Sequence, residues 1–297
     1  MKILSLDGGG VFGVGQALTL SQIDNSQWDA VCGTSIGSAI AAMIATGKPV
    51  SVEFFRKHMP KIFSHKRIGS PLFYSRYSDK AINEILTDIF RSDCLKNAQI
   101  PVFITATSID QQCEKVFSSS NIEDESKLFS DVVRASCSAQ TYFRPWQGFG
   151  DGGVFTNNPS MIAITWVSRE FGIPLEEIEV CSIGTGTFSR GEYNRSDNLF
   201  FWSQWIFSSL FEGGADKMFD EISSSLPLKR YERYQFVKRP YWKIDNVKDM
   251  TEAIEDWTRP AMDFSFDIKN KFFSGNDGEI VKLGENEAKN FDEVLNE

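Results

Sequence analysis

The feature that most constrains the fold is the pentapeptide GTSIG at residues 33–37, which separates an apolar run from a stretch of small residues. The apolar run is WDAVC at residues 28–32, and the small-residue stretch is SAIAAMIA at residues 38–45. A Gly-x-Ser-x-Gly motif between a strand and a helix is typical of a turn that carries a nucleophilic serine. The helix that follows offers free N–H groups to developing negative charge. The sequence therefore predicts Ser35 as a nucleophile at the end of a buried strand.

Strand-like and helix-like segments alternate along the chain. The expected strands are residues 2–6, 28–32, 102–109, 114–117, 148–150 and 178–183, and the expected helices include 14–23, 35–46, 51–63, 79–90, 127–137 and 159–171. This alternation predicts an α/β fold of three α/β/α layers around a mostly parallel central sheet. Reactive groups in such sheets gather at the carboxyl ends of the strands. Four of the expected strands end before a glycine, at Gly8, Gly33, Gly152 and Gly184. We expect these four ends to meet at one edge of the sheet.

Composition narrows the class of protein. The chain has 297 residues, of which 41% are hydrophobic, and no linker or repeat divides it, so we expect one domain over residues 1–297. The chemical motifs fall within residues 1–190. Beyond them the pattern is weaker, with helices expected at 197–211 and 215–226, a strand at 231–237 and an acidic amphipathic end.

Charge and cysteine content exclude several functions. The net charge of −9 argues against general nucleic-acid binding. The five cysteines include no C-x-x-C pair, which argues against a disulfide framework or a structural zinc site. The apolar start at residues 1–7 is too short for a signal peptide, and residues 30–47 are too polar for a membrane span. We expect a cytoplasmic protein with reduced thiols and no metal or cofactor.

Ser35 needs a base, and histidine is scarce in this chain. The two histidines, His58 and His65, lie in the basic segment 53–67, so the serine–acid–histidine order of α/β-hydrolases is nearly excluded. Asp151 is the candidate carboxylate, because it follows an aromatic strand and precedes two glycines. A free aspartate has a pKa of about 3.9, so Asp151 must be desolvated to act as a base near neutral pH. The alternative is an ordinary Asp-Gly turn.

The run of Gly8, Gly9 and Gly10 at the end of the first expected strand is the candidate oxyanion hole. Successive glycines leave backbone N–H groups unshielded, so these amides can face a developing negative charge. The same loop is also compatible with phosphate binding, as in sugar kinases of the actin-like fold. The chain has no G-x-x-x-x-G-K-[ST] motif, which excludes a P-loop.

Three motifs in fixed order closely resemble the patatin-like phospholipase family. They are DGGGVFG at residues 7–13, GTSIG at 33–37, and DGGV at 151–154 followed by NNP at 157–159. Residues 135–145, 182–186 and, more loosely, 230–235 also resemble segments of that family.

The resemblance implies a histidine-free dyad in which Ser35 is the nucleophile and Asp151 is the base, with the amides of Gly8, Gly9 and Gly10 as the oxyanion hole. It implies metal-free hydrolysis of phospholipid, lysophospholipid or galactolipid acyl esters through an acyl-serine intermediate. Membrane phospholipids would then be the substrates, reached at the inner membrane surface.

One position departs from the family pattern and one segment has no assigned role. Phe12 stands where the family usually has arginine or lysine, so a positive charge beside the glycine loop is lost. Residues 200–211 are rich in aromatic side chains, which is compatible with a lid at a membrane or with a core or subunit-interface helix.

A phospholipase inside a cell must be controlled by a lid, a homo-oligomer or a ligand. Some bacterial patatin-like enzymes resemble this chain in compactness and are antiviral effectors that cyclic nucleotides activate, which implies a cyclic-nucleotide activator here. Two other classes stay open at this point, an actin-fold sugar kinase and a catalytically silent binding or storage protein.

Overall fold

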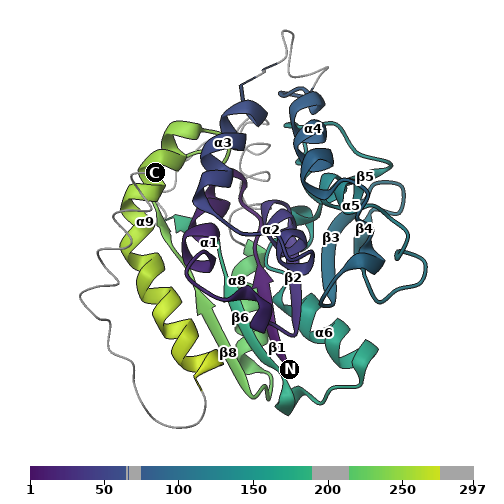
Figure 1. Cartoon of the computed structure of the whole chain (residues 1–297), viewed down its shortest axis with the longest axis vertical. Coiled ribbons are helices and arrows are strands. Elements are labelled where there is room, and N and C mark those ends of the chain that lie inside the picture. The colour runs from purple at the N-terminus through teal and green to yellow at the C-terminus, as the bar shows by residue number, and fades with distance from the viewer. Residues whose placement is uncertain (65, 67–74, 189–213, 275–297) are drawn as a thin grey trace, which may run out of the picture.

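The computed structural model of the chain describes residues 1–64, 66, 75–188 and 214–274 and contains a central seven-stranded sheet (Figure 1). The strand order is β4-β3-β2-β1-β6-β8, and β5 also pairs with β3. The strands are β1 (Lys2–Leu6), β2 (Ala30–Thr34), β3 (Val102–Ser108), β4 (Cys113–Ser118), β5 (Phe149–Asp151), β6 (Glu179–Ile183) and β8 (Arg230–Tyr234). All neighbouring pairs are parallel except those of β3 with β4 and with β5. The predicted mostly parallel sheet is thus confirmed.

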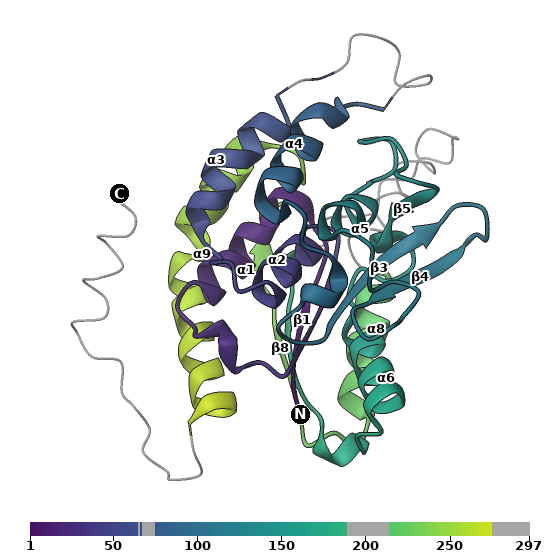
Figure 2. The ribbon, with the colours of Figure 1, turned by 45° about the vertical axis from the view of Figure 1, so that its right-hand side comes forward.

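Helices cover both faces of this sheet (Figure 2). One face carries α1 (Gly13–Leu20), α2 (Ile36–Ala45), α5 (Phe129–Ser136) and α9 (Val247–Ile268), with α3 (Val52–Ile62) and α4 (Asp79–Phe90) beyond them. The other face carries α6 (Ser160–Phe171) and α8 (Gly214–Ser225). The α/β/α layering predicted from the alternating segments is confirmed.

The side chains of the strands explain why both faces are covered. Along β1, Leu4 and Leu6 belong to the apolar core under α1 and α2, whereas Ile3 belongs to the core under α6. Side chains alternate between the two faces of a strand, so a strand that is apolar on both sides must be covered on both.

Helix α2 consists mainly of small and apolar residues because it runs close to the sheet. All of its residues are buried. A Cβ atom at Gly37 would lie 2.3 Å from the carbonyl oxygen of Leu6 in β1, so this position has no room for a side chain. The small-residue stretch after Ser35 is therefore a packing requirement of the helix that holds the serine.

Strand β5 does not share the parallel direction of most of the sheet. The strand is antiparallel to β3, whereas β1, β2 and β6 end together as predicted. Because β4 occupies the other edge of β3, β5 lies on the same edge as β2 and continues where β2 stops. Thr34 at the end of β2 pairs with Thr105, and Asp151 at the end of β5 pairs with Ala106. The carboxyl ends of β2 and β5 therefore meet.

The C-terminal part differs in detail from the expected elements. The single strand expected at residues 231–237 is divided into β8 and β9 (Val237–Lys238), and β9 pairs with β7 (Thr187–Phe188). Gln235 lies between the two strands. Its side-chain oxygen accepts a 2.6 Å hydrogen bond from the Gly186 amide. The helix expected at residues 197–211, with its aromatic segment 200–211, lies outside the described residues, as does His65. Among the helices that the structure describes, none combines the length and the apolar composition that a membrane span requires.

Candidate active site

Ser35 lies at the junction of β2 and α2 in a strained backbone conformation, with φ 51° and ψ −123°. A non-glycine residue adopts positive φ at a cost, so its surroundings must hold it there. Its N–H donates to the Ser136 hydroxyl over 2.8 Å, and its carbonyl oxygen accepts from the Ser38 hydroxyl over 2.6 Å. Space is also limiting, because a Cβ at Gly33 would lie 2.4 Å from the Gly37 carbonyl oxygen. The geometry is that of the sharp turn predicted from the motif.

The hydroxyl of Ser35 donates a 2.5 Å hydrogen bond to Oδ2 of Asp151. The other carboxylate oxygen of Asp151 accepts from the Gly153 amide over 2.8 Å. Asp151 is only 1% exposed, and this burial raises its pKa to about 7, against the opposing effect of the hydrogen bonds from Ser35 and Gly153. A carboxylate whose pKa lies near neutrality and which touches the serine hydroxyl has the chemistry of a general base.

The backbone of Asp151 is fixed at both of its polar groups. Its N–H donates to the Ser138 carbonyl over 3.0 Å, and its carbonyl oxygen accepts from the Thr107 hydroxyl over 2.7 Å. Two residues earlier on β3, Thr105 shares a 2.7 Å hydrogen bond with Thr34, directly before the serine. Strand β3 thus holds the end of β2 and the end of β5 with alternate threonines. Sequence reasoning missed this role, although the TATS run at residues 105–108 was the available signal.

The glycine loop lies beside Ser35, but its three amides differ. The Gly8 N–H donates to the Asn157 carbonyl over 3.1 Å, so it is already engaged. Gly9 and Gly10 line the pocket that contains Ser35, and their amides make no hydrogen bond to another residue in the described part of the chain. Gly10 has φ +60°, and a Cβ there would lie 2.2 Å from the Ile244 carbonyl oxygen. Of the three predicted oxyanion donors, the Gly8 amide is therefore already paired, and Gly9 and Gly10 remain the candidates.

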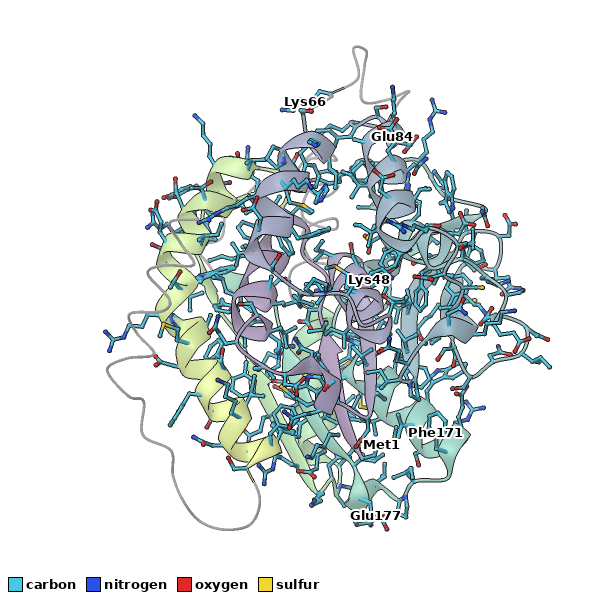
Figure 3. All side chains as sticks on the ribbon, in the orientation of Figure 1. Met1, Lys48, Lys66, Glu84, Phe171 and Glu177 are labelled. Carbon is cyan, nitrogen blue, oxygen red and sulfur yellow. The ribbon has the colours of Figure 1, made fainter. Side chains whose placement is uncertain are left out.

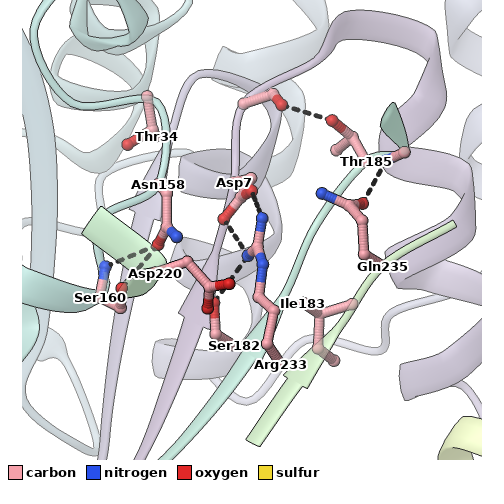
Figure 4. A network of polar contacts seen from close by, with 12 residues as sticks. Asp7, Thr34, Asn158, Ser160, Ser182, Ile183, Thr185, Asp220, Arg233 and Gln235 are labelled. Atoms are coloured by element: carbon pink, nitrogen blue, oxygen red, sulfur yellow. Dashed lines mark hydrogen bonds and ion pairs between the residues drawn. The ribbon is translucent and has the colours of Figure 1, made fainter. Parts of the chain in front are cut away.

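A buried ion pair anchors the start of this loop (Figure 4). Both guanidinium ends of Arg233 in β8 donate to the carboxylate of Asp7, one of them over 2.9 Å. The same guanidinium donates to the Ser182 hydroxyl over 2.7 Å, and Thr185 donates to the Gly8 carbonyl over 2.6 Å. Two strands on the far side of β1 thus fix the loop, which the sequence alone did not reveal.

Phe12, the departure from the family pattern, is a core residue. Its ring is buried and stacks on Trp242 at 5.5 Å and lies 5.7 Å from Trp257. The ammonium of Lys238 lies 4.8 Å from the centre of the same ring. A positive charge is thus present near the loop, supplied by β9 and packed on the phenylalanine.

His58, the histidine that the structure describes, lies outside the Ser35 pocket. His58 lies on α3 with its ring 4.9 Å from Phe54, and it is not among the residues that line the Ser35 pocket. Burial lowers the pKa of His58, and neighbouring Lys57 and Lys61 lower it further.

An apolar pocket opens from Ser35 and Asp151. Its apolar walls come from α2, α3, α4 and the segment before β5, and include Ile36, Met59, Ile62, Phe63, Ile82, Tyr142 and Phe143. A pocket with a reactive polar end and long apolar walls fits a hydrocarbon chain attached to an ester. In the part of the chain that is described, no group of three histidine, cysteine or acidic side chains is arranged to hold a metal.

Comparison with known proteins gives a consistent result. A family model described as "Patatin-like phospholipase" matches residues 4–164. Patatin-like protein 1 of Arabidopsis thaliana is 27% identical over 281 residues, which cover 74% of this chain and 66% of that protein. The cUMP-AMP-activated phospholipase of Escherichia coli is 24% identical over 215 residues, which cover 63% of this chain and 65% of that protein. The chain thus spans slightly less than two thirds of these curated relatives.

Among solved structures, that of VipD from Legionella pneumophila matches with a TM-score of 0.44 at 10% identity, over 99% of this chain and 73% of that chain.

Proposed function

The chain belongs to the patatin-like phospholipase family, and from this premise we propose that it hydrolyses acyl esters of phospholipids through an acyl-serine intermediate. The observation that carries the proposal is the 2.5 Å hydrogen bond from Ser35 to the buried carboxylate of Asp151 at the end of an apolar pocket. Membership of the family supports lipid acyl hydrolysis in general. The dyad and the phospholipase A type of reaction are our assignment.

In the first half of the proposed reaction, Oγ of Ser35 attacks the ester carbonyl carbon while Asp151 takes the hydroxyl proton. The carbonyl oxygen becomes negatively charged, and the amides of Gly9 and Gly10 face it as hydrogen-bond donors. When this intermediate collapses, the bond to the alcohol oxygen breaks, and Asp151 returns its proton to that oxygen. The products are an acyl-serine and a lysophospholipid.

In the second half, a water molecule attacks the acyl-serine carbonyl carbon and gives a proton to Asp151. The intermediate again places its negative oxygen at Gly9 and Gly10. Collapse breaks the bond to Oγ of Ser35, which recovers the proton from Asp151, and the fatty acid leaves. The apolar pocket would hold the acyl chain through both halves, which keeps the ester carbonyl in reach of the serine.

Release of fatty acid from mixed phospholipid vesicles tests this proposal. Ser35→Ala and Asp151→Asn are each expected to lower the rate on the order of a thousandfold. The matched controls are Ser224→Ala on α8 and Asp256→Asn on α9, both of which change exposed or half-exposed side chains. Full activity of folded Ser35→Ala would contradict the proposal, and loss of activity in His58→Ala would point to a histidine base instead.

Control by a ligand is a further part of the proposed function. The support is the E. coli relative, whose name describes activation by cUMP-AMP. A cyclic-nucleotide activator would also suit the antiviral role that some bacterial members have. Fatty-acid release should rise in the presence of one member of a panel of cyclic di- and oligonucleotides, and equal rates with every member would contradict this part.

A further inference from the structure

We propose that Arg76, which contacts two residues lining the Ser35 pocket, binds the phosphate of the substrate headgroup. The enzyme would then prefer glycerolipids that carry a phosphate to neutral acylglycerols of the same chain length. The inference rests on the proposed function, because it assigns a specificity residue to the same site.

Arg76 is held against two residues that line the pocket together with Ser35. Its guanidinium carbon lies 5.1 Å from the centre of the Tyr142 ring, and one guanidinium nitrogen donates to Asp245 over 2.8 Å. Its backbone N–H donates to the Thr141 carbonyl, and the next amide, of Tyr77, donates to the Tyr142 carbonyl. Backbone and side chain together fix the position of the guanidinium at this wall.

The Arg76 guanidinium has N–H donors beyond the one that binds Asp245. The Arg76 side chain is 50% exposed, whereas that of Asp245 is buried and also accepts from the Tyr77 hydroxyl over 2.7 Å. A guanidinium carries five N–H donors in a planar fork, and the bond to Asp245 is the one side-chain hydrogen bond found for Arg76 among the described residues. Such a fork matches two oxygens of a phosphate.

The charges around the pocket single out this residue. The charged residues that line the pocket are Asp151 and Asp245, and the whole chain carries a net charge of −9. A phosphate anion would therefore be repelled by the interior and attracted by the Arg76 guanidinium. A second cation, Lys66, is exposed at the top of the molecule in Figure 3. Its backbone forms a β-bridge to Tyr77, the residue after Arg76.

The chemistry of the substrate fits this placement. In a glycerophospholipid the phosphate and the acyl esters are attached to one three-carbon unit. When an ester carbonyl lies at Ser35 with its chain in the apolar pocket, the phosphate lies only a few atoms from the serine. We assign the guanidinium beside Tyr142 and Asp245 as the partner of that phosphate. A neutral acylglycerol would use the same pocket and the same dyad but leave Arg76 without a partner.

The test compares 1-palmitoyl-lysophosphatidylcholine with 1-palmitoylglycerol in the same detergent micelles. The ratio of their kcat/KM values should fall about tenfold to a hundredfold in Arg76→Gln and less in Arg76→Lys, which keeps the charge but not the fork. The matched control is Arg239→Gln, since Arg239 is 44% exposed and pairs with Asp256 over 2.7 Å on α9, and its ratio should stay that of the wild type. An unchanged ratio in Arg76→Gln would overturn the proposal.

A second variant removes the carboxylate that Arg76→Gln would leave without its cation. The double variant Arg76→Gln/Asp245→Asn should show the same loss of ratio, and a wild-type ratio would trace the effect to Asp245 and overturn the proposal. Inorganic phosphate should leave the phospholipid rate unchanged, and competition at millimolar concentration would assign the site to free phosphate. A wild-type enzyme inactive on both substrates and on mixed phospholipid vesicles would contradict the proposed function rather than this inference.

Discussion

Asp151 shows how burial changes the proton affinity of an ordinary side chain. The carboxylate is enclosed where β2 and β5 meet, and its two oxygens are used by Ser35 and the Gly153 amide. Desolvation disfavours the charged form more than these hydrogen bonds favour it, so its pKa rises to about 7. An aspartate in solution could not be half-ionised at this pH. Under the proposed mechanism, Asp151 takes the part that histidine has in most serine hydrolases.

This pKa predicts the pH dependence of the rate. The base must be ionised to accept the Ser35 proton, so kcat/KM should fall tenfold per pH unit below about pH 7 and level off above it. The measurement is a pH–rate profile with a soluble ester from about pH 5 to about pH 9. Glu114→Gln should keep the same acid limb, because burial also raises the pKa of Glu114 but its side chain contacts Thr156 rather than Ser35. A rate that is flat down to pH 5 would contradict the assignment.

Residues whose role depends on the local chain could be predicted, and those that act through distant partners could not. Ser35 and the glycine loop can be recognised in the sequence because a sharp turn needs specific neighbouring residues. Ser136 and Arg233 act across 101 and 226 positions of sequence, on Ser35 and Asp7 respectively, and nothing in a single sequence reports such pairs. For the same reason, the engagement of the Gly8 amide by Asn157 could not be foreseen.

At the level of elements, the site depends on strand β3, which pairs with β2 over its first half and β5 over its second. The sequence gives no direction for β5, because three residues carry too little periodicity to show it. The long apolar strands were predictable since burial on both faces leaves a continuous run. Strand β5 was predictable as a short strand at residues 148–150 that runs into a tight turn at Asp151, but its direction was not.

Arg134 connects three elements around the pocket and should be costly to remove. Its buried guanidinium donates to Asp79 and Asn83 of α4 and to the hydroxyl of Ser138, whose carbonyl holds the Asp151 amide. Arg134→Met should lower the free energy of unfolding by about 3–5 kcal/mol, because it removes the buried cation of the ion pair with Asp79 together with its hydrogen bonds to Asn83 and Ser138. Urea titration measures this.

Arg144→Met is the matched control for this element. Arg144 lies 3.8 Å from the same Asp79 but is 62% exposed, so its loss should cost about 1 kcal/mol or less. Equal effects of the two substitutions would show that the buried guanidinium does not hold α4, α5 and the segment before β5 together.

At the scale of the whole molecule, the family match ends at residue 164 but the site does not. Arg233 fixes Asp7, and the Ile244 carbonyl accepts from the Val11 amide in the glycine loop. Helix α9 packs on α1 and brings Trp257 against Phe12. The C-terminal elements were the least predictable from sequence, yet they support the loop on its far side.

Because these segments share one core, we expect the whole chain to unfold in one transition, as a single domain would. Far-UV circular dichroism and tryptophan fluorescence should give coincident urea curves. Trp257→Ala, which empties a buried site beside Phe12, should shift both curves together by about 3–5 kcal/mol. Two separated transitions, or a shift in fluorescence alone, would show that the C-terminal part is a separate unit.

The central claim is that Asp151 activates Ser35 as the nucleophile, and covalent labelling with a fluorophosphonate tests it most directly. Intact-protein and peptide mass spectrometry should find one phosphonyl group per chain, located on Ser35. The second-order rate of labelling should fall by about a hundredfold or more in Asp151→Asn and stay unchanged in Asp256→Asn. Labelling at another residue, or a wild-type rate in Asp151→Asn, would contradict the account.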